Sequence, residues 1–560
     1  MNGSRENQGP VRRLKQVKDS DYTAVSEGRI RIRIGAVIFM FALMVAVVRM
    51  AEVSLLSPSN KSFYPAKSGP VTRADIVDRN GVLLASTIEG FDLYINRSET
   101  WNPSETATKI SELFEDLDAE SLSKRIQGGR GQFLVRRGLT PAQKREVFAL
   151  GLPGTVFQGE SRRFYPQGHL ASHIVGFSDV DMNGIAGAER AFNDLLTEDN
   201  APSLALSIDL RVQNAVAEEL SNAIDRFGAD TGAAIVMNMN TGEILAMVSL
   251  PNFDPNAPGT SSPQNLYNHA SMSTYELGSV FKPITMAMAL EAGVTDLEET
   301  FPVQDPLKVR DRFIRDDHPS KIPLAMPEIL AESSNRGTAL MAMRVGGDGQ
   351  RDFLRKLGLM ERVPIELVES AAPQVQREWQ DITTVTVSYG HGISVTPLAL
   401  TAATSALLNG GEYVAPTLRR QDSVTRSQRR RVISQDTSRT LRDLMRYVAT
   451  DGTGRNAAVE GYSVMGKTGT ADKPSGDGYD ERRLVSSFIA GFPYENPQYT
   501  VFVTLDEPKA IEGTYGYATA GWNAAPTTGK IIERIAPMLG VQRHIGAEPL
   551  SPFSKTEPVR

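Results

Sequence analysis

The 560-residue sequence predicts an α+β protein with a large domain behind a single N-terminal membrane helix. Three observations predict this class. Apolar residues form an unbroken run from 34 to 48. The dipeptide Asn80-Gly81 and the turn 240–242 each separate two apolar runs of strand length, which is typical of β-hairpins. Amphipathic helical patterns recur at 102–150 and 209–224.

The N-terminal segment has the pattern of an uncleaved signal anchor. Residues 1–33 contain eight basic and four acidic residues, a balance of +4. Because a bilayer span needs about 20 residues, we predict a transmembrane helix over 34–56, with Arg49 snorkelling near its far end. No small-x-small cleavage site follows, which disfavours a cleaved signal peptide, and the basic flank disfavours a buried soluble helix. The positive-inside rule predicts a cytoplasmic tail at 1–33 and export of everything after residue 56.

Composition excludes several classes of function. A content of 41% apolar and 22% charged residues is that of a folded protein. The net charge of −6 argues against nucleic acid as a partner. The absence of cysteine excludes disulfides and thiol catalysis, and the six histidines show no metal-ligand spacing. We therefore expect no metal and no cofactor.

The exported part divides into four predicted segments. Residues 57–68 have the composition of a linker, and 69–203 suggest a small α+β pedestal with strands at 162–166 and 171–177. The pedestal offers no nucleophile–base pair, which indicates a spacer or docking module. Residues 204–540 are enough for one well-packed domain. The Pro- and Ser-rich tail 541–560 is predicted to be disordered.

The strongest candidate for chemistry is Ser279-x-x-Lys282. On a helix this spacing puts the hydroxyl and the amine on one face. Gly278 suits a sharp entry into that helix, whose N-terminal amides, that of Ser279 included, favour developing negative charge. A desolvated lysine can remove the proton of a serine nucleophile. The same pattern occurs at Ser121-x-x-Lys124, where the charged amphipathic context favours a solvated helix face.

Two later motifs offer partners to Ser279. Ser333-Ser334-Asn335, at a helix end or in a short loop, supplies a hydroxyl that can relay a proton and an amide that can bind lysine and substrate. Lys467-Thr468-Gly469-Thr470 follows a predicted strand, on which Lys467 and Gly469 share one face. We expect Gly469 to let a substrate backbone approach, and the backbone N–H groups of Thr470 and Ser279 to hold an oxyanion.

The ordered set SxxK, SxN and KTG is the signature of penicillin-recognising serine acyltransferases. The chain resembles the class B penicillin-binding proteins, and among them the division-specific, septal peptidoglycan D,D-transpeptidases. The resemblance extends to about residue 535, and no segment is left for a glycosyltransferase domain. Departures from the family are Ala74, Leu277 and Arg336. The further matching residues are Arg73, Asp78-Arg79-Asn80-Gly81, Arg163, Tyr165-Pro166, Gly187, Glu189, Tyr275-Glu276, Tyr389-Gly390-His391-Gly392, Val395-Thr396-Pro397, Gly452-Thr453-Gly454, Lys473 and Asp506-Glu507-Pro508.

The resemblance implies a transpeptidase domain, an antiparallel sheet flanked by helices, on an elongated dimerisation-type pedestal. It implies attack by Ser279 on the penultimate D-alanine of a stem peptide, with Lys282 as general base. Ser333 would relay a proton to the leaving amine, and Asn335 would hold Lys282 and the substrate amide. Lys467 and Thr468 would bind the carboxylate of a stem peptide or a β-lactam.

The resemblance also implies a place and partners. The catalytic domain is expected on the outer side of the cytoplasmic membrane at the division site, with a septal glycan polymerase and other divisome membrane proteins as partners. Four alternatives stay open: an elongation-type transpeptidase, a D,D-carboxypeptidase or β-lactamase of the same superfamily, a β-lactam-sensing receptor, and a divisome scaffold. A single membrane span disfavours the receptor.

Two polar clusters have plainer interpretations. His391 lies in a glycine-flanked loop, where a structural role is favoured over a direct part in the site. Asp316, Asp317 and His318 form a polar loop that we expect to be exposed rather than to bind metal.

Overall fold

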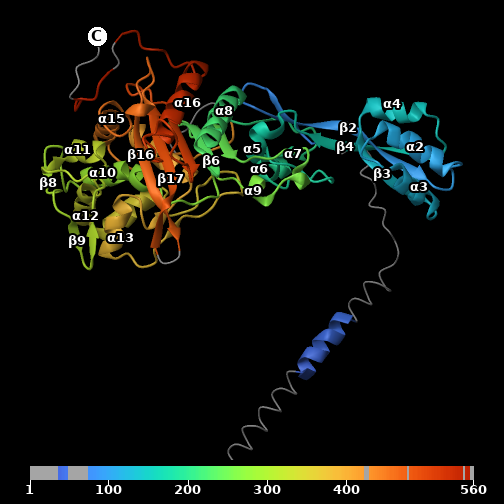
Figure 1. Ribbon diagram of the computed structural model, residues 1–560, viewed down its shortest axis with the longest axis horizontal. Coiled ribbons are helices and arrows are strands. Elements are labelled where there is room, and N and C mark those ends of the chain that lie inside the picture. The colour runs from blue at the N-terminus through green and yellow to red at the C-terminus, as the bar shows by residue number, and fades with distance from the viewer. Residues whose placement is uncertain (1–35, 48–72, 422–427, 476–477, 547–548, 555–560) are drawn as a thin grey trace, which may run out of the picture. The chain divides into compact units, whose positions relative to one another are not determined.

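The computed structural model describes residues 36–47, 73–421, 428–475, 478–546 and 549–554 (Figure 1). The chain divides into two compact units, residues 1–71 and 72–560. In the first unit, residues 36–47 form a helix. Within the described ranges, no helix is long and apolar enough to cross a membrane. The tail 1–33, the linker 57–68 and the rest of the predicted anchor 34–56 lie outside the described residues.

The pedestal is built on a five-stranded sheet of order β3-β2-β1-β5, with β4 pairing β2. Asn80-Gly81 connects β1 to β2 as predicted, and Gly81 has the positive φ of +85° that such a turn requires. Buried Leu93 and Ile95 of β2 pack against the helices α2 to α4. The elements are β1 (Ile76–Val77), β2 (Leu83–Asn96), α2 (Pro103–Leu113), α3 (Ala119–Gln127), β3 (Gln132–Leu139), α4 (Pro141–Ala149), β4 (Thr155–Phe164), η2 (Gly168–Ala171), α5 (Ser172–Val175), α6 (Gly187–Ala191), α7 (Asn193–Leu196) and β5 (Leu204–Ala205).

One pedestal element was predicted wrongly. Residues 171–177 form no strand but the end of η2 and the short helix α5, which stops where Gly176 takes a φ of +72°. A short apolar run has no periodicity that separates a buried strand from a buried helical turn. His173 in this segment is buried and hydrogen-bonds the Asn265 carbonyl at 2.9 Å, so it is a satisfied structural histidine.

Three of the pedestal motifs meet in one buried ion cluster. Glu189 receives Arg73 Nε on one carboxylate oxygen at 2.5 Å and Arg163 Nε on the other at 2.7 Å. Arg163 Nη1 also donates to the Arg73 carbonyl at 3.1 Å. All three side chains are at most 2% exposed. The cluster joins segments about a hundred residues apart and holds the pedestal together.

The Asp78-Arg79-Asn80-Gly81 turn fastens the pedestal to the next domain. Asp78 Oδ2 accepts the Leu210 N–H at 3.1 Å, so it satisfies a free amide at the start of α8 (Leu210–Phe227). Arg79 Nη1 donates to the Ser207 carbonyl at 3.2 Å. These contacts give the hairpin a role in joining the pedestal to the large domain.

The large domain has an antiparallel sheet of order β16-β17-β18-β6-β7 with helices on both faces (Figure 1). Successive side chains of a strand point to opposite faces of the sheet, so neighbouring residues of β6 pack in different cores. Ala234 and Val236 pack with α8 and α16. Ala233 and Ile235 face the core that contains α10, α14 and α15. Its principal elements are α8, β6 (Thr231–Asn238), β7 (Ile244–Leu250), α10 (Lys282–Glu291), α14 (Pro397–Leu408), α15 (Gln435–Thr450), β16 (Met465–Ser475), β17 (Gly478–Phe492), β18 (Tyr499–Asp506) and α16 (Ala524–Met538).

Shorter elements connect these layers. Two-residue and three-residue strands form separate ladders, and helices α11 to α13 lie on the α10 side. They are η3 (Pro258–Thr260), α9 (Pro263–Leu266), η4 (Gly278–Phe281), β8 (Thr300–Phe301), β9 (Leu307–Val309), β10 (Arg312–Ile314), β11 (Leu324–Ala325), α11 (Met326–Ala331), α12 (Asn335–Lys356), β12 (Gln374–Val375), α13 (Asp381–Ser388), β13 (Ile393–Ser394), β14 (Glu412–Val414), β15 (Arg429–Arg431) and η6 (Arg455–Ala457).

Part of the C-terminal tail is ordered, against the prediction for 541–560. Ser551 Oγ donates to the Asp443 carbonyl at 2.7 Å, and the Pro549 carbonyl accepts Arg446 Nε at 2.9 Å. The Phe553 ring lies 6.3 Å from that of Tyr447. Composition alone missed this because a few specific contacts with α15 suffice to order a short polar segment.

Candidate active site

Ser279 lies in the 3₁₀ turn η4, which leads directly into α10 at Lys282. In a 3₁₀ turn residues i and i+3 eclipse each other, and this is the spacing of Ser279 and Lys282. Gly278 enters the turn with a φ of +59°, and Pro283 stands at the start of α10, where its missing N–H costs nothing. Ser279 itself is half-buried.

Lys282 is fully buried, and its ammonium group points at the junction between α11 and α12. Its Nζ donates to the Ser333 carbonyl oxygen and, at 3.0 Å, to the Ser333 hydroxyl. Burial lowers the pKa of Lys282 to about 7, although the carboxylates of Asp316 and Asp317 act in the opposite direction. Near neutral pH a large fraction of Lys282 is therefore the free amine that a general base must be.

Ser333 has the left-handed backbone that turns its polar groups toward the lysines. Its φ is +62°, a conformation that costs a non-glycine residue energy and is concentrated at functional sites. The Ser333 hydroxyl accepts Lys282 Nζ and Lys467 Nζ, each at 3.0 Å. Because both lone pairs of the oxygen are then occupied, its proton is the one group left to donate. A hydroxyl so placed can pass a proton to a leaving amine.

Lys467 is the second fully buried lysine, and it comes from the edge strand β16. Besides Ser333, its Nζ donates to the carbonyl and the hydroxyl of Thr468 at 3.0 and 3.2 Å. Burial, and then the charge of Lys282, hold the pKa of Lys467 well below its usual range. A bound carboxylate would favour the protonated form again.

Thr453 is a partner of the site whose role the sequence analysis did not assign. Its hydroxyl lies 2.9 Å from that of Thr468. It stands in the Gly452-Thr453-Gly454 loop, a family match that we noted without a role. Two hydroxyls beside Lys467 form a hydrogen-bonding set suited to a carboxylate.

Two glycines let β16 pack closely against η4 (Gly278–Phe281), the turn that contains Ser279 and is called the nucleophile turn below. A Cβ on Gly469 would stand 2.5 Å from the Leu277 carbonyl oxygen and 2.8 Å from Val280 Cγ1. A Cβ on Gly278 would stand 2.7 Å from the Thr470 carbonyl oxygen. The structure therefore gives Gly469 a packing reason, the close approach of η4, which the sequence analysis had not considered. The same approach brings the Thr470 backbone beside Ser279.

Asn335, the amide of the SxN motif, makes a different contact from the predicted one. Its Nδ2 donates to the Arg315 carbonyl at 3.1 Å, and its backbone N–H donates to Asp316 Oδ1 at 2.6 Å. Among the described contacts of Asn335, none joins it to Lys282. Asn335 begins α12 with Ser334 as N-cap, directly after the end of α11, where the sequence analysis expected a helix end or a short loop.

Asp316 organises this junction, which the sequence analysis missed. Its carboxylate accepts the Ser334 hydroxyl at 2.7 Å, the Arg336 N–H at 3.0 Å and Arg336 Nε at 3.0 Å. The side chain is 6% exposed and that of Arg336 is 2% exposed. The predicted exposed loop is thus wrong for Asp316. Arg336, a departure from the family pattern, was the signal that could have suggested a buried carboxylate partner.

The division-type signature residues also meet in space. Lys473 Nζ donates to Asp506 Oδ1 at 2.9 Å and to Glu507 Oε1 at 2.8 Å. Arg483 pairs with Glu507 as well, and hydrogen bonds from Arg483 and Lys473 hold the pKa of Glu507 at about 2. The cluster ties β16, β17 and the end of β18 together at the strand ends beyond Thr470.

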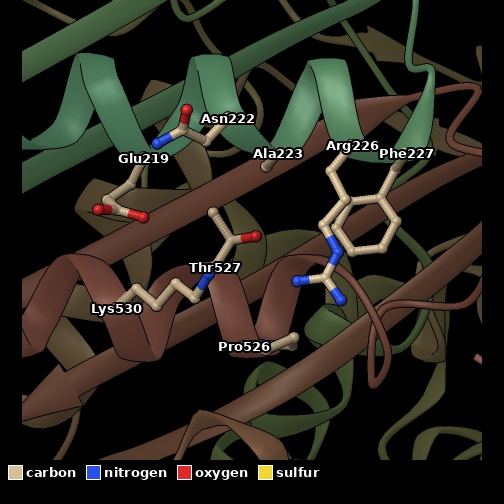
Figure 2. A pocket seen from close by; sticks show the side chains of 8 residues that line it. All are labelled: Glu219, Asn222, Ala223, Arg226, Phe227, Pro526, Thr527 and Lys530. Atoms are coloured by element: carbon tan, nitrogen blue, oxygen red, sulfur yellow. The ribbon is translucent and has the colours of Figure 1, made fainter. Parts of the chain in front are cut away.

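Two other features are not the site. Lys124 of the second SxxK match pairs with Glu120 at 2.6 Å and both side chains are more than 70% exposed, which confirms the solvated helix face. A cavity of about 60 Å³ lies between α8 and α16, on the sheet face opposite α10. Figure 2 shows its lining, which includes Glu219, Arg226 and Lys530, with none of the SxxK, SxN or KTG residues.

The fold and this constellation define a class. A serine on a helical turn, a lysine one turn on, a polar helix junction and a lysine on an edge strand are the parts of penicillin-recognising serine acyltransferases. Residues 232–533 match the penicillin binding protein transpeptidase domain, and residues 68–197 match the penicillin-binding protein dimerisation domain. The chain belongs to the penicillin-binding protein transpeptidase family, in its class B branch.

Relatives agree over most of the chain. It is 40% identical to the probable peptidoglycan D,D-transpeptidase FtsI of Caulobacter vibrioides, over 92% of this chain and 89% of that protein. It is 31% identical to the peptidoglycan D,D-transpeptidase FtsI of Escherichia coli K12, over 78% and 76%. A crystal structure of a peptidoglycan synthetase from Bifidobacterium adolescentis has the same fold, with a TM-score of 0.67, 22% identity and coverage of 86% of this chain and 98% of that one.

Proposed function

We propose that this protein is a serine D,D-transpeptidase that cross-links peptidoglycan stem peptides through an acyl-enzyme on Ser279. The observation that carries the proposal is the shared hydrogen bonding of Lys282 and Lys467 to the Ser333 hydroxyl, beside the turn that contains Ser279. The names of the relatives support the reaction type. β-Lactams would be covalent inhibitors.

The acylation step follows from these positions. Neutral Lys282 takes the Ser279 proton as Ser279 Oγ attacks the penultimate D-alanine carbonyl. The N–H groups of Ser279 and Thr470 stabilise the oxyanion. The C–N bond breaks, and the proton passes from Lys282 through Ser333 to the leaving D-alanine. Lys467 and Thr468, with Thr453, bind the terminal carboxylate, and Asn335 binds the substrate amide.

The deciding experiment is mass spectrometry of the protein after incubation with benzylpenicillin. A stable adduct of one whole penicillin, located on the peptide that contains Ser279 and absent from Ser279→Ala, is expected. An adduct on another residue would contradict the assignment. Rapid turnover of penicillin without a lasting adduct would instead indicate a β-lactamase or a carboxypeptidase.

The rate of penicillin acylation should rise with pH through about 7. Lys282 accepts a proton only as the free amine, and its pKa is lowered to about 7, so the reactive form is lost as pH falls below that value. Stopped-flow measurement of the second-order acylation rate constant from pH 5.5 to 9 tests this. A rate that keeps rising about tenfold per pH unit up to pH 9, as an ordinary lysine with a pKa of about 10.4 would cause, would show that burial does not tune Lys282.

Gly469→Ala should reduce acylation by at least about tenfold. The new methyl group would lie 2.5 Å from the Leu277 carbonyl oxygen, so β16 and the nucleophile turn must separate. A misplacement of about 1 Å at reacting groups can cost about a hundredfold. Gly478→Ala on the neighbouring strand is the matched control, because a Cβ there meets nothing within 4 Å. Equal acylation rates in the two variants would refute the packing argument.

The predicted membrane context is part of the proposal. A cytoplasmic tail at 1–33, a helix over 34–56, a pedestal at 69–203 and a transpeptidase domain at 204–540 would place Ser279 outside the cytoplasmic membrane. We propose a role at the division septum with a glycan polymerase and other divisome proteins as partners. A fluorescent fusion at midcell supports this, while a side-wall pattern favours an elongation enzyme. Normal division with Ser279→Ala would favour a scaffold.

A further inference from the structure

A polar cluster beside the nucleophile turn is not used in the proposed acylation step. Glu276, three residues before Ser279, accepts the Gly392 N–H on Oε1 and the Tyr479 hydroxyl on Oε2, each at 2.9 Å. His391 Nδ1 lies 3.7 Å from Glu276 Oε2. Tyr389 and Tyr479 flank the imidazole, each with its ring centroid 5.5 Å away. The cluster thus combines a carboxylate, an imidazole and two phenols from three segments.

Backbone contacts fix this cluster close to Ser279. The Gly390 carbonyl accepts the Gly278 N–H at 3.3 Å. A Cβ on Gly390 would stand 2.2 Å from the Gly278 oxygen, so only glycine allows this approach. Gly390, the neighbour of His391, therefore contacts Gly278, the neighbour of Ser279. Its side chain is 25% exposed and that of Glu276 is 11% exposed, so a solute can reach both.

The second half of the proposed reaction, transfer of the acyl group to an acceptor amine, needs a proton acceptor that acylation does not need. The acceptor on a neighbouring stem peptide is a primary amine, which at neutral pH is an ammonium ion without a lone pair. For an alkyl amine with a pKa of about 10.4, only about one molecule in 2,500 is the free base at pH 7. Lys282 and Ser333 can pass one proton from a free amine to Ser279 Oγ, but an ammonium ion carries a second.

We propose that Glu276 and His391 form the acceptor-amine site, in which Glu276 binds the ammonium ion and His391 removes its extra proton. The inference rests on the proposed transpeptidase function. The imidazole takes one proton from R–NH₃⁺, leaving R–NH₂ and an imidazolium, which returns the proton to water only after the amine has attacked. The amine nitrogen then bonds to the acyl carbon, and the bond to Ser279 Oγ breaks. The second proton passes through Ser333 and Lys282 to Ser279 Oγ.

The charges around His391 suit this role. Burial lowers the pKa of His391, as does the charge of Lys282, while the carboxylates of Glu276, Asp472 and Asp317 act in the opposite direction. Tyr389 and Tyr479 are neutral at physiological pH, because burial and Glu276 raise the pKa of both phenols, that of Tyr389 to about 12. The imidazole is thus neutral at pH 7 and able to accept a proton.

The test separates aminolysis from hydrolysis of one acyl-enzyme. The purified full-length protein is given a soluble D-alanyl thioester as acyl donor and Nα-acetyl-D-lysine as acceptor amine, and both products are measured from pH 6.5 to 9.5. Both products form from the same acyl-enzyme. The ratio of aminolysis to hydrolysis therefore does not depend on how the protonation of Lys282 affects the acylation rate. We expect the wild-type ratio to change less than about threefold between pH 7 and 9.

His391→Gln should lower the ratio of aminolysis to hydrolysis at pH 7 by at least about a hundredfold, the lower end of the range for general-base catalysis. Its ratio should then rise about tenfold per pH unit, because the variant depends on free amine from solution. Glu276→Gln should instead raise the acceptor concentration needed for half-maximal aminolysis and keep the flat pH profile. His544→Gln, which alters another histidine paired with a glutamate, at 2.9 Å from Glu495, should match the wild type.

Two outcomes overturn the inference. One is that His391→Gln gives the same ratio of aminolysis to hydrolysis as the wild type, with the same pH dependence. The cluster would then serve only to connect β17 to the nucleophile turn. The other is a wild-type ratio that itself rises tenfold per pH unit, which decides the matter even if His391→Gln fails to fold. Failure of the wild type to form any acyl-enzyme would instead refute the proposed function.

Discussion

Lys282→Ala is expected to reduce acylation of Ser279 by benzylpenicillin at least about 10³-fold. A serine hydroxyl is a weak nucleophile unless an adjacent base takes its proton, and a positioned base contributes about 10² to 10⁴ in rate. The variant also leaves the Ser333 hydroxyl and carbonyl without their buried donor. The rate of labelling by a fluorescent penicillin measures the effect.

The chain contains its own matched control for this experiment. Lys124→Ala changes the lysine of an identical SxxK spacing in α3, where the side chain is 73% exposed and pairs with Glu120. Labelling of Lys124→Ala should equal that of the wild type. Normal labelling of Lys282→Ala, with an intact fold by circular dichroism, would show that another group activates Ser279.

Glu189→Gln is expected to lower the free energy of unfolding of the pedestal by about 3–5 kcal/mol, the usual cost of breaking a buried ion pair. The substitution keeps the shape of the side chain but removes the charge that compensates Arg73 and Arg163. An arginine cannot escape by losing its proton. Two guanidinium groups would then stay charged in a core from which water is excluded.

Thermal and urea unfolding of the purified full-length protein measure this effect, with the pedestal transition expected first. Glu120→Gln removes an exposed pair at the surface of α3 and should cost less than about 0.5 kcal/mol. A loss below about 1 kcal/mol in Glu189→Gln would show that both arginines find sufficient partners elsewhere. For Arg73 these are the Met182 carbonyl and the Asn193 amide oxygen. For Arg163 they are the Arg73 carbonyl and the Thr87 hydroxyl.

Local patterns predicted the elements that are set by local physics. The Asn80-Gly81 hairpin, the helix that begins after Asp209 and the hairpin around 240–242 all lie where the sequence placed them. Their signals are a turn residue with positive φ, an N-cap carboxylate and apolar alternation, which act within a few residues. The short apolar run at 171–177 was predicted wrongly because burial of the whole segment hides its period.

The sequence by itself determined the chemistry and the family. The order of SxxK, SxN and KTG, and the absence of cysteine and of metal-ligand spacing, already pointed to acyl transfer through Ser279. These are properties of residue type and spacing, and folding does not alter them.

Only the tertiary structure decided how the groups meet. Contacts between segments that are distant in the chain determine three features of the site. These are the left-handed turn at Ser333, the ion pair of Asp316 with Arg336 and the approach of Glu276 to His391. The free-amine character of Lys282 has the same origin, because the pKa of a lysine falls only when packing removes water from it. No local pattern encodes that burial.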